Sequence, residues 1–150
     1  MNQLSIISIK LPEIELLKEF LSALGNSMKN FRYFENRNFY ALKKHLCTFL
    51  ILEEGKPVCY GHLDKEYETV WLGIAVIDEK IGKGLGKIMM EKLISEAMSI
   101  KVNQIFLSVD NDNIKAINLY KKYGFNLIEK TPVISKFILN IEKKNNELYF

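Results

Sequence analysis

A loop with glycine at alternate positions, Gly82–Gly86, is the first feature of this sequence that predicts chemistry. Glycines at this spacing let a backbone turn tightly and direct its amide N–H groups at a ligand. Apolar residues then recur at helical spacing, so a helix is expected to begin here with free N–H groups and the positive end of its dipole. With Lys80, Lys83 and Lys87 nearby, the arrangement favours a phosphate site over a plain tight turn.

Two common nucleotide motifs do not fit this loop. A P-loop requires Gly-x-x-x-x-Gly-Lys-Ser/Thr, and here Ile88 follows Lys87 where Ser or Thr is needed. A dinucleotide fingerprint requires Gly-x-Gly-x-x-Gly, and the third glycine comes one residue early, at Gly86. The phosphate is therefore expected in another kind of site.

Asn113 and Tyr120 form a second candidate pair. In a helix predicted over residues 113–123 they lie two turns apart, so their side chains point to the same face. A purely structural alternative makes Asn113 the N-cap of that helix, for which asparagine is well suited, and Tyr120 a core residue. Asparagine is able to do both.

These two motifs have the order and spacing typical of one family. The glycine loop after a mid-chain strand, with Asn113, Tyr120 and the turn Tyr123-Gly124-Phe125 behind it, resembles the GNAT superfamily of acyl-CoA-dependent N-acetyltransferases. The resemblance is close over the second half of the chain and concerns only the order of elements in the first half. It implies direct transfer of an acetyl group from acetyl-CoA to a primary amine in a ternary complex.

The resemblance also implies residue roles. Loop amides would hold the cofactor's pyrophosphate, Asn113 would contact the pantetheine arm, and Tyr120 would protonate the departing CoA thiolate. Backbone amides near Val76 would stabilise the oxyanion. The family usually has Gln or Arg where this chain has Ile81, so one polar contact is missing. The implied cofactor-binding residues are Ile74, Val76, Ile81, Gly82, Lys83, Gly84, Leu85, Gly86, Lys87, Asn113 and Tyr120.

A protonated amine has no lone pair, so a general base must accept its proton directly or through water. The family often places a carboxylate on or beside the strand before the loop, but the strand predicted over 70–76 contains no acid. His62 and Asp64 alternate on one face of the neighbouring strand. We expect one of them to act as the base or to bind the amine; otherwise His62 is a structural histidine and Asp64 serves a turn.

An aromatic segment, Phe31–Tyr40, contains both arginines of the chain, Arg32 and Arg37. The resemblance places the acceptor-binding segment here, and guanidinium groups suit a phosphate or carboxylate bidentately. We therefore expect Arg32, Tyr33, Arg37 and Trp71 to bind an anionic acceptor, such as a nucleotide-linked amino sugar. The alternative is a helix whose arginines extend over an aromatic core.

A mixed α/β fold must position these residues. The expected elements are strands over 4–9, 48–52, 58–63, 70–76, 104–109, 125–128 and 133–141, and helices over 12–24, 87–99 and 113–123. Three of the strands form an antiparallel meander before the glycine loop. The resemblance implies a mainly antiparallel central sheet flanked by helices, in which the strands at Val70 and Gln104 splay to admit the cofactor. A charged tail, 142–147, is expected to fray.

The composition of the 150 residues, 48% hydrophobic and 26% charged, suits a single domain over residues 1–150. The net charge of +3 is spread along the chain and predicts no nucleic-acid surface. Cys47 and Cys59 show neither metal-ligand nor disulfide spacing, which indicates a reducing, cytoplasmic location without a metal. The sequence shows no signal peptide and no membrane-spanning run, and a homodimer is possible.

Two alternative functions stay open. One is a non-catalytic acyl-CoA-binding module, against which the presence of Tyr120 argues. The other is acetylation of a protein or peptide amine, which needs an open acidic groove; the aromatic segment fits a small enclosed acceptor better. Neither cysteine lies in the motifs, so an acetyl-cysteine intermediate is not expected.

Overall fold

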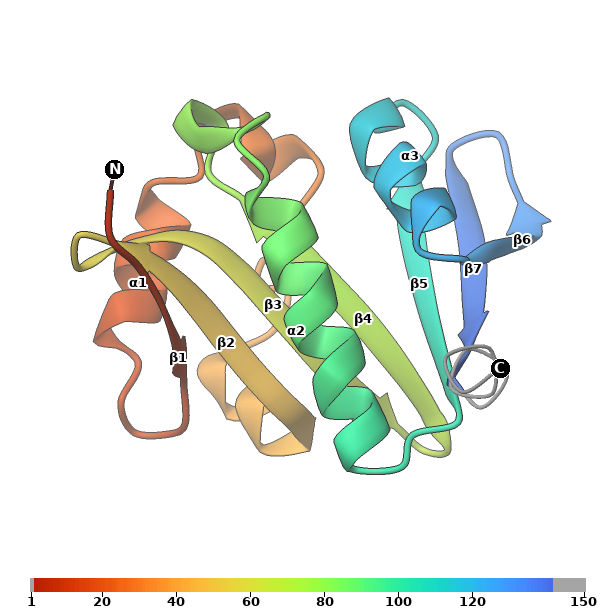
Figure 1. Cartoon of the computed structure of the whole chain (residues 1–150), viewed down its shortest axis with the longest axis horizontal. Helices are drawn as coiled ribbons and strands as arrows, with labels where there is room; N and C mark the ends of the chain where they lie inside the picture. Colours follow the sequence, from red (N-terminus) through yellow and green to blue (C-terminus); the bar gives the residue numbers. More distant parts are fainter. Residues whose placement is uncertain (1, 142–150) are drawn as a thin grey trace.

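Residues 2–141, which the computed structural model describes, contain seven strands that form one sheet in the order β1-β2-β3-β4-β5-β7-β6 (Figure 1). The strands are β1 (Leu4–Ser8), β2 (His45–Glu53), β3 (Lys56–Glu66), β4 (Thr69–Val76), β5 (Gln104–Asp110), β6 (Asn126–Lys130) and β7 (Ile134–Asn140). The helices are α1 (Glu15–Ser22), α2 (Leu85–Ser99) and α3 (Ile114–Lys122), with the short 3-10 helices η1 (Gly25–Lys29), η2 (Phe39–Lys44) and η3 (Asp78–Lys80).

Strands β2, β3 and β4 form the antiparallel meander that the sequence predicts, with β3 in its centre. Both β2 and β3 are longer than predicted, because polar residues extend the pairing. His45, for example, lies opposite Asp64 at one end of the ladder. A search for apolar runs stops at such residues, although the backbone continues the strand.

A wedge between β4 and β5 is the feature that opens the sheet. These two strands are parallel and pair at a single position, Trp71 opposite Phe106, where the ring centroids lie 5.8 Å apart. Beyond this pair the strands diverge toward the carboxyl end of β4 (Figure 1). The splay predicted at Val70 and Gln104 is confirmed.

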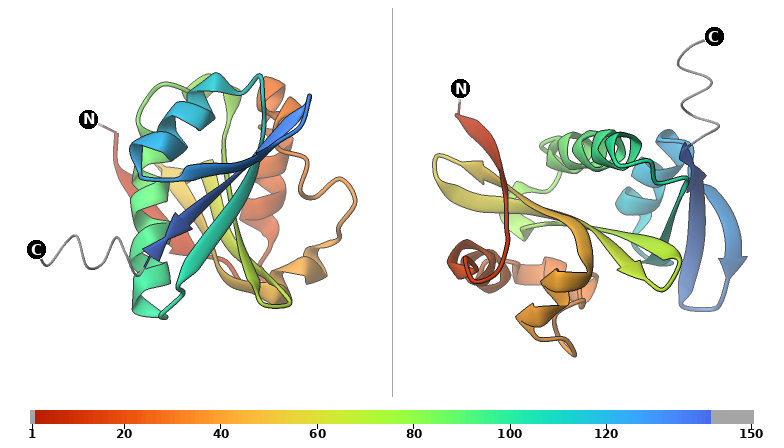
Figure 2. Two further views of the ribbon diagram at one scale, coloured as in Figure 1. Left: turned by 90° about the vertical axis from the view of Figure 1, so that its right-hand side faces the viewer. Right: turned by 90° about the horizontal axis from the view of Figure 1, so that it is seen from below.

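Helices α2 and α3 cover one face of the sheet, and α1 with the segment 25–44 covers the other (Figure 2). Side chains alternate along β3, so Gly61 faces α2 whereas Tyr60 faces α1. A Cβ at Gly61 would lie 2.5 Å from the side chain of Met89, so glycine is what lets α2 pack directly on β3. On the opposite face the Tyr60 ring stacks on Phe20, with centroids 5.9 Å apart.

The first helix is shorter than the predicted range 12–24. Pro12 lies in a turn before α1, and the helix ends ahead of Gly25, whose φ of +63° is left-handed. Its buried residues are Leu17 and Phe20.

Within residues 2–141, no helix is long and apolar enough to cross a bilayer. The same residues contain no group of three or more side chains placed to hold a metal ion. The tail predicted to fray, 142–147, lies outside the described residues.

Candidate active site

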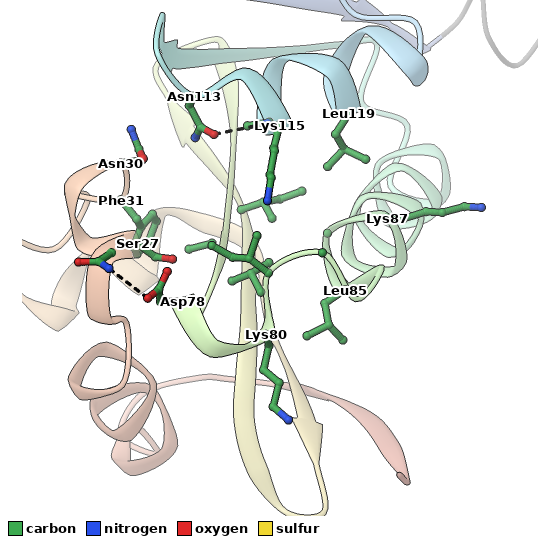
Figure 3. Close-up of a pocket in the computed structure, with 18 of the residues that line it drawn as sticks. Ser27, Asn30, Phe31, Asp78, Lys80, Leu85, Lys87, Asn113, Lys115 and Leu119 are labelled. Carbon is green, nitrogen blue, oxygen red and sulfur yellow. Dashed lines mark hydrogen bonds between the residues drawn. The ribbon is translucent and has the colours of Figure 1, made fainter. Parts of the chain in front are cut away.

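A cavity of about 530 Å³ occupies the open end of the wedge (Figure 3). Its walls come from the end of β4, the glycine loop, the first turn of α2, α3 and the segment 26–31. Ten residues that the sequence analysis assigned to cofactor binding line it: Ile74, Val76, Ile81, Gly82, Gly84, Leu85, Gly86, Lys87, Asn113 and Tyr120. Lys83, the remaining residue of that set, is not in the wall.

The glycine loop presents open backbone to this cavity. Gly82 and Gly84 both have a φ of +83°, and a Cβ built on either would meet nothing within 4 Å. Gly84 is the N-cap of α2, and no side chain within residues 2–141 caps this end of the helix. The first N–H groups of α2 are therefore free to bind an anion, with the helix dipole behind them.

The lysines around the loop differ in direction. Lys80 pairs with Glu53 at 2.6 Å, and Figure 3 shows both Lys80 and Lys87 pointing away from the centre of the cavity. Lys115, from the first turn of α3, extends into it instead. Lys115 was not among the predicted site residues; its place two residues after Asn113, at the start of a predicted helix, was the available signal.

Asn113 and Tyr120 lie on the same side of α3, as predicted. The Asn113 side chain caps the helix by accepting a hydrogen bond from the backbone N–H of Ala116 at 3.4 Å, and it also lines the cavity. Tyr120 is only 6% exposed, and its ring packs against Phe125 at 5.8 Å. Burial raises the pKa of Tyr120 to about 12, so its phenol stays protonated near neutral pH.

Part of the wall comes from residues 26–31, which overlap the predicted acceptor-binding segment, 31–40, only at Phe31. Ser27, Asn30 and Phe31 line the cavity opposite α3 (Figure 3). Phe31 also packs on Tyr60 of β3, with centroids 5.2 Å apart. Sequence reasoning missed Ser27 and Asn30, because no local pattern shows that residues so distant in sequence meet across the wedge.

The structure pairs both arginines with carboxylates. Arg32 makes two hydrogen bonds of 3.0 Å to Asp110 at the end of β5. The guanidinium lowers the pKa of Asp110, and the carboxylate raises the pKa of Arg32. Arg37 lies over the Tyr33 ring at 4.3 Å and approaches Glu66 at 3.8 Å. Neither arginine lines the cavity.

Trp71 and Tyr33 also lie away from the cavity wall. Trp71 packs against Phe106 where the wedge closes. The Tyr33 hydroxyl donates to the Oδ2 atom of Asp64 at 2.7 Å and contacts Nε2 of His45 at 2.7 Å. Both side chains therefore lie on the face of the sheet that α1 covers, near Asp64, and not in the cavity.

Asp64 belongs to a partly buried chain of hydrogen bonds. Because Tyr33 donates to Asp64, its hydroxyl oxygen accepts from Nε2–H of His45. The Nδ1 atom of His45 lies 2.7 Å from the Thr48 hydroxyl, which donates to this nitrogen when the ring is neutral. Burial lowers the pKa of His45 to about 4, so the imidazole is neutral near pH 7. Oδ1 of Asp64 is buried without a partner in the described part of the chain.

His62 lies beside this chain on the same face of β3, as predicted. Its Nδ1 atom is 2.6 Å from the Tyr60 hydroxyl, and burial lowers its pKa well below the ordinary range. Its Nε2 atom reaches over β4, where a Cβ on Gly73 would lie only 2.6 Å away. Glycine at position 73 is therefore what makes room for the imidazole.

Comparisons with known proteins agree with this geometry. A family model described as the acetyltransferase (GNAT) family matches residues 14–125. Over 64 residues, the chain is 44% identical to the spermine/spermidine N(1)-acetyltransferase of Bacillus subtilis. That match covers 41% of this chain and 42% of the relative, so the chain aligns with less than half the length of that protein.

Solved structures extend the likeness over most of the chain. The ribosomal-protein-S18-alanine N-acetyltransferase of Escherichia coli has a TM-score of 0.72 at 22% identity, covering 93% of this chain and 94% of that one. The yncA protein of Salmonella typhimurium, solved with its cofactor acetyl-CoA, has a TM-score of 0.75 at 15% identity, covering 92% and 94%. The expected GNAT-like α/β fold is thus confirmed.

Proposed function

The chain belongs to the acetyltransferase (GNAT) family, and from this premise we propose that it transfers an acetyl group from acetyl-CoA to a primary amine of a small acceptor. The observation that carries the proposal is the cavity in the β4–β5 wedge. It has the free N–H groups of α2 at one end and the buried Tyr120 in its wall. Its volume of about 530 Å³ is that of a small-molecule site.

The cavity wall fits an acyl-CoA. The amides that follow Gly84 would bind the pyrophosphate, with Lys115 extending into the same space as a counter-charge. Ile74 and Val76 supply apolar contacts, and Asn113 a polar one, for a pantetheine arm. When bound, acetyl-CoA supplies an activated thioester. Beyond the pair at Trp71, backbone groups of β4 on the β5 side have no strand partner among the described residues, which leaves N–H groups to polarise a carbonyl.

Tyr120 is the proposed general acid. Its phenol lies in the cavity wall and keeps its proton, since burial raises its pKa to about 12. A thiolate that forms beside it would take that proton. Neither Cys47 nor Cys59 lines the cavity, which supports direct transfer to the amine over an acetyl-cysteine route.

His62 is the proposed proton acceptor for the amine through water, since the residue is buried and does not line the cavity itself. Its Nε2 atom extends over Gly73 on the α1 side of β4, and the residue is neutral because burial lowers its pKa. Asp64 is the weaker candidate, because one of its oxygens already accepts from Tyr33.

For the acceptor we propose a polyamine such as spermidine. The relative from Bacillus subtilis carries that activity in its name. The sequence analysis favoured an anionic amino-sugar nucleotide because of Arg32 and Arg37, but both guanidinium groups already have carboxylate partners. A paired arginine offers little to a second anion, so the motive for that acceptor is weakened.

Three further expectations stay predictions: one domain over residues 1–150, a homodimer and a cytoplasmic location. The last is supported by Cys47 and Cys59, which are both free thiols. Burial raises the pKa of Cys47 to about 12, so this thiol is expected to be unreactive.

A panel of amines tests the proposal. Release of CoA from acetyl-CoA would be measured with spermidine, spermine, an amino-sugar nucleotide and a peptide with a free N-terminus. We expect the polyamines to give the highest kcat/KM. Preference for the sugar nucleotide would restore the anionic acceptor, and binding of acetyl-CoA without release for any amine would favour the non-catalytic module.

A further inference from the structure

One short segment, residues 25–32, spans the open end of the wedge from β4 to β5. It connects α1 to the aromatic residues on the α1 side of the sheet and includes η1. Five of its residues line the cavity: Asn26, Ser27, Lys29, Asn30 and Phe31. Whatever holds this bridging segment in place therefore shapes one wall of the proposed active site.

At its first end the bridging segment is attached to Asp78, just beyond β4. The backbone N–H of Asp78 donates to the carbonyl of Leu24 at 3.0 Å. The Asn26 amide donates to the Asp78 carboxylate at 3.2 Å. A Cβ on Gly25 would lie 3.0 Å from the Cβ of Asp78, so the bridging segment and the start of η3 are in direct contact.

At its second end the bridging segment is attached to Asp110, the last residue of β5. Asn30 donates to the Asp110 carboxylate at 2.8 Å, and Arg32 donates twice at 3.0 Å. Arg32 also donates to the carbonyl of Lys29 within the segment itself. The guanidinium thus joins its own segment to β5, the strand that diverges from β4.

We propose that the Arg32–Asp110 ion pair positions the bridging segment, and that Arg32 thereby controls acceptor binding without touching the acceptor. The inference rests on the proposed function. Phe31 lies between the two anchoring side chains, Asn30 and Arg32, and forms the aromatic wall against Tyr60. Without the ion pair, that wall loses its fixed distance from Tyr120 across the cavity.

The choice of arginine follows from this geometry. A guanidinium donates to both carboxylate oxygens at once and still reaches the Lys29 carbonyl, whereas a lysine ammonium is a point charge without that planar fork. Lysine is used at nearly every other basic position of the chain. The hydrogen bonds of Arg32 therefore explain why arginine stands here, whereas a position that needs only a surface charge can hold lysine.

The test uses Arg32→Ala, Asp110→Ala and the double variant, with spermidine as the acceptor. Positioning predicts that each single variant raises the KM for spermidine by roughly three- to tenfold, as expected for a half-exposed bidentate pair. The double variant should be no worse than either single one, and the KM for acetyl-CoA should change less than about twofold in all three. Glu129→Gln, which breaks the surface pair with Lys136 on the β6–β7 hairpin, is the matched control and should behave as wild type.

The signs of the two single effects separate positioning from direct electrostatics. If Arg32 acted on a cationic acceptor through its charge, Arg32→Ala would lower the KM and Asp110→Ala would raise it. Opposite signs, or additive losses in the double variant, would overturn the proposal.

Hydrogen exchange tests the bridge independently of turnover. Amides of residues 26–32 should exchange faster in both single variants, and Arg32→Lys should restore part of the protection. Unchanged exchange would refute the positioning role even if the KM rises. If the wild type does not acetylate spermidine, the proposed acceptor is rejected, and the exchange rates alone decide whether the ion pair holds the segment.

Discussion

Tyr120 combines a buried ring with a position in the cavity wall. Its side chain is 6% exposed and packs on Phe125, so its orientation is fixed by the turn that ends α3. Burial, which raises its pKa to about 12, keeps the phenol protonated across the usual assay range. The residue is thus placed to give a proton and not to accept one.

Tyr120→Phe should lower kcat at least tenfold, because general acid catalysis typically contributes about 10²–10⁴-fold. Binding of acetyl-CoA, measured by calorimetry, should stay within about twofold of wild type, since only the hydroxyl is lost. Tyr123→Phe is the control, because Tyr123 does not line the cavity. Equal single-turnover rate constants for wild type and Tyr120→Phe would remove Tyr120 from the mechanism.

Ile81 offers the opposite kind of test, a gain of affinity. It lines the cavity and is 39% exposed, at a position where the resemblance implies Gln or Arg. Ile81→Arg should tighten acetyl-CoA binding by roughly two- to tenfold, the value of one added hydrogen bond. Ile100→Arg changes an isoleucine of similar exposure, 41%, outside the cavity and should leave the Kd unchanged. Equal Kd values for both variants would place Ile81 away from the phosphates.

At the scale of elements, the glycine loop depends on left-handed backbone. Gly84→Val places a β-branched residue at a φ of +83° and a side chain in front of the first N–H groups of α2. Acetyl-CoA binding should fall below detection by calorimetry while the circular dichroism spectrum stays native. The positive φ alone costs about 1–2 kcal/mol of stability.

Gly55→Val is a matched control for that loss. Gly55 also has a φ of +83° and open space around its Cβ position, but it lies in the turn between β2 and β3. The variant should lose similar stability and keep wild-type affinity for acetyl-CoA. Similar affinities in the Gly84→Val and Gly55→Val proteins would show that the loop does not bind the cofactor.

The elements that carry the cofactor cavity could be predicted from the sequence because their signals are local. The glycine loop, the cap at Asn113 and the meander each follow from neighbouring residues. The bridging segment could not be predicted, since its place depends on contacts with Asp78 and Asp110, far away in sequence. Arg32 shows the consequence: its type suggested an anion, and only the fold reveals Asp110 as that anion.

At the scale of the whole molecule, the chain of hydrogen bonds around Asp64 joins the aromatic segment, residues 31–40, to the sheet. It connects Tyr33, from the aromatic segment, to His45 and Thr48 of β2 and to Asp64 of β3. Protonation of His45 places a charge in a desolvated part of this chain and reverses its hydrogen bond with Thr48. Acidification is therefore expected to loosen the α1 face before it affects α2 and α3.

The protein should lose stability as pH falls from about 6.5 toward 4. The folded-state pKa of His45 is about 4, below its ordinary value of 6.5, so the unfolded chain binds the proton first. This contribution is fully present above pH 6.5 and is lost as the pH falls through that window. His62, whose pKa is also lowered, acts in the same direction.

Denaturant unfolding at several pH values measures this effect. His45→Gln should make the unfolding free energy fall less steeply with falling pH, by the contribution of one titrating group. Glutamine can donate and accept hydrogen bonds without titrating. Thr48→Val, which removes the partner of Nδ1 but not the titrating group, should lower stability at every pH and keep the slope. An unchanged slope in His45→Gln would mean that His45 is not neutral in the folded protein.

Direct acetyl transfer within this cavity is tested most directly by a single turnover with the protein in excess over acetyl-CoA labelled in the acetyl group. After mixing with spermidine and rapid quenching, the label should pass from CoA to the amine, with no labelled protein at any time. Tyr120→Phe should give the same product more slowly. Label that appears on the protein before the amine, or that stays on CoA, would contradict direct transfer.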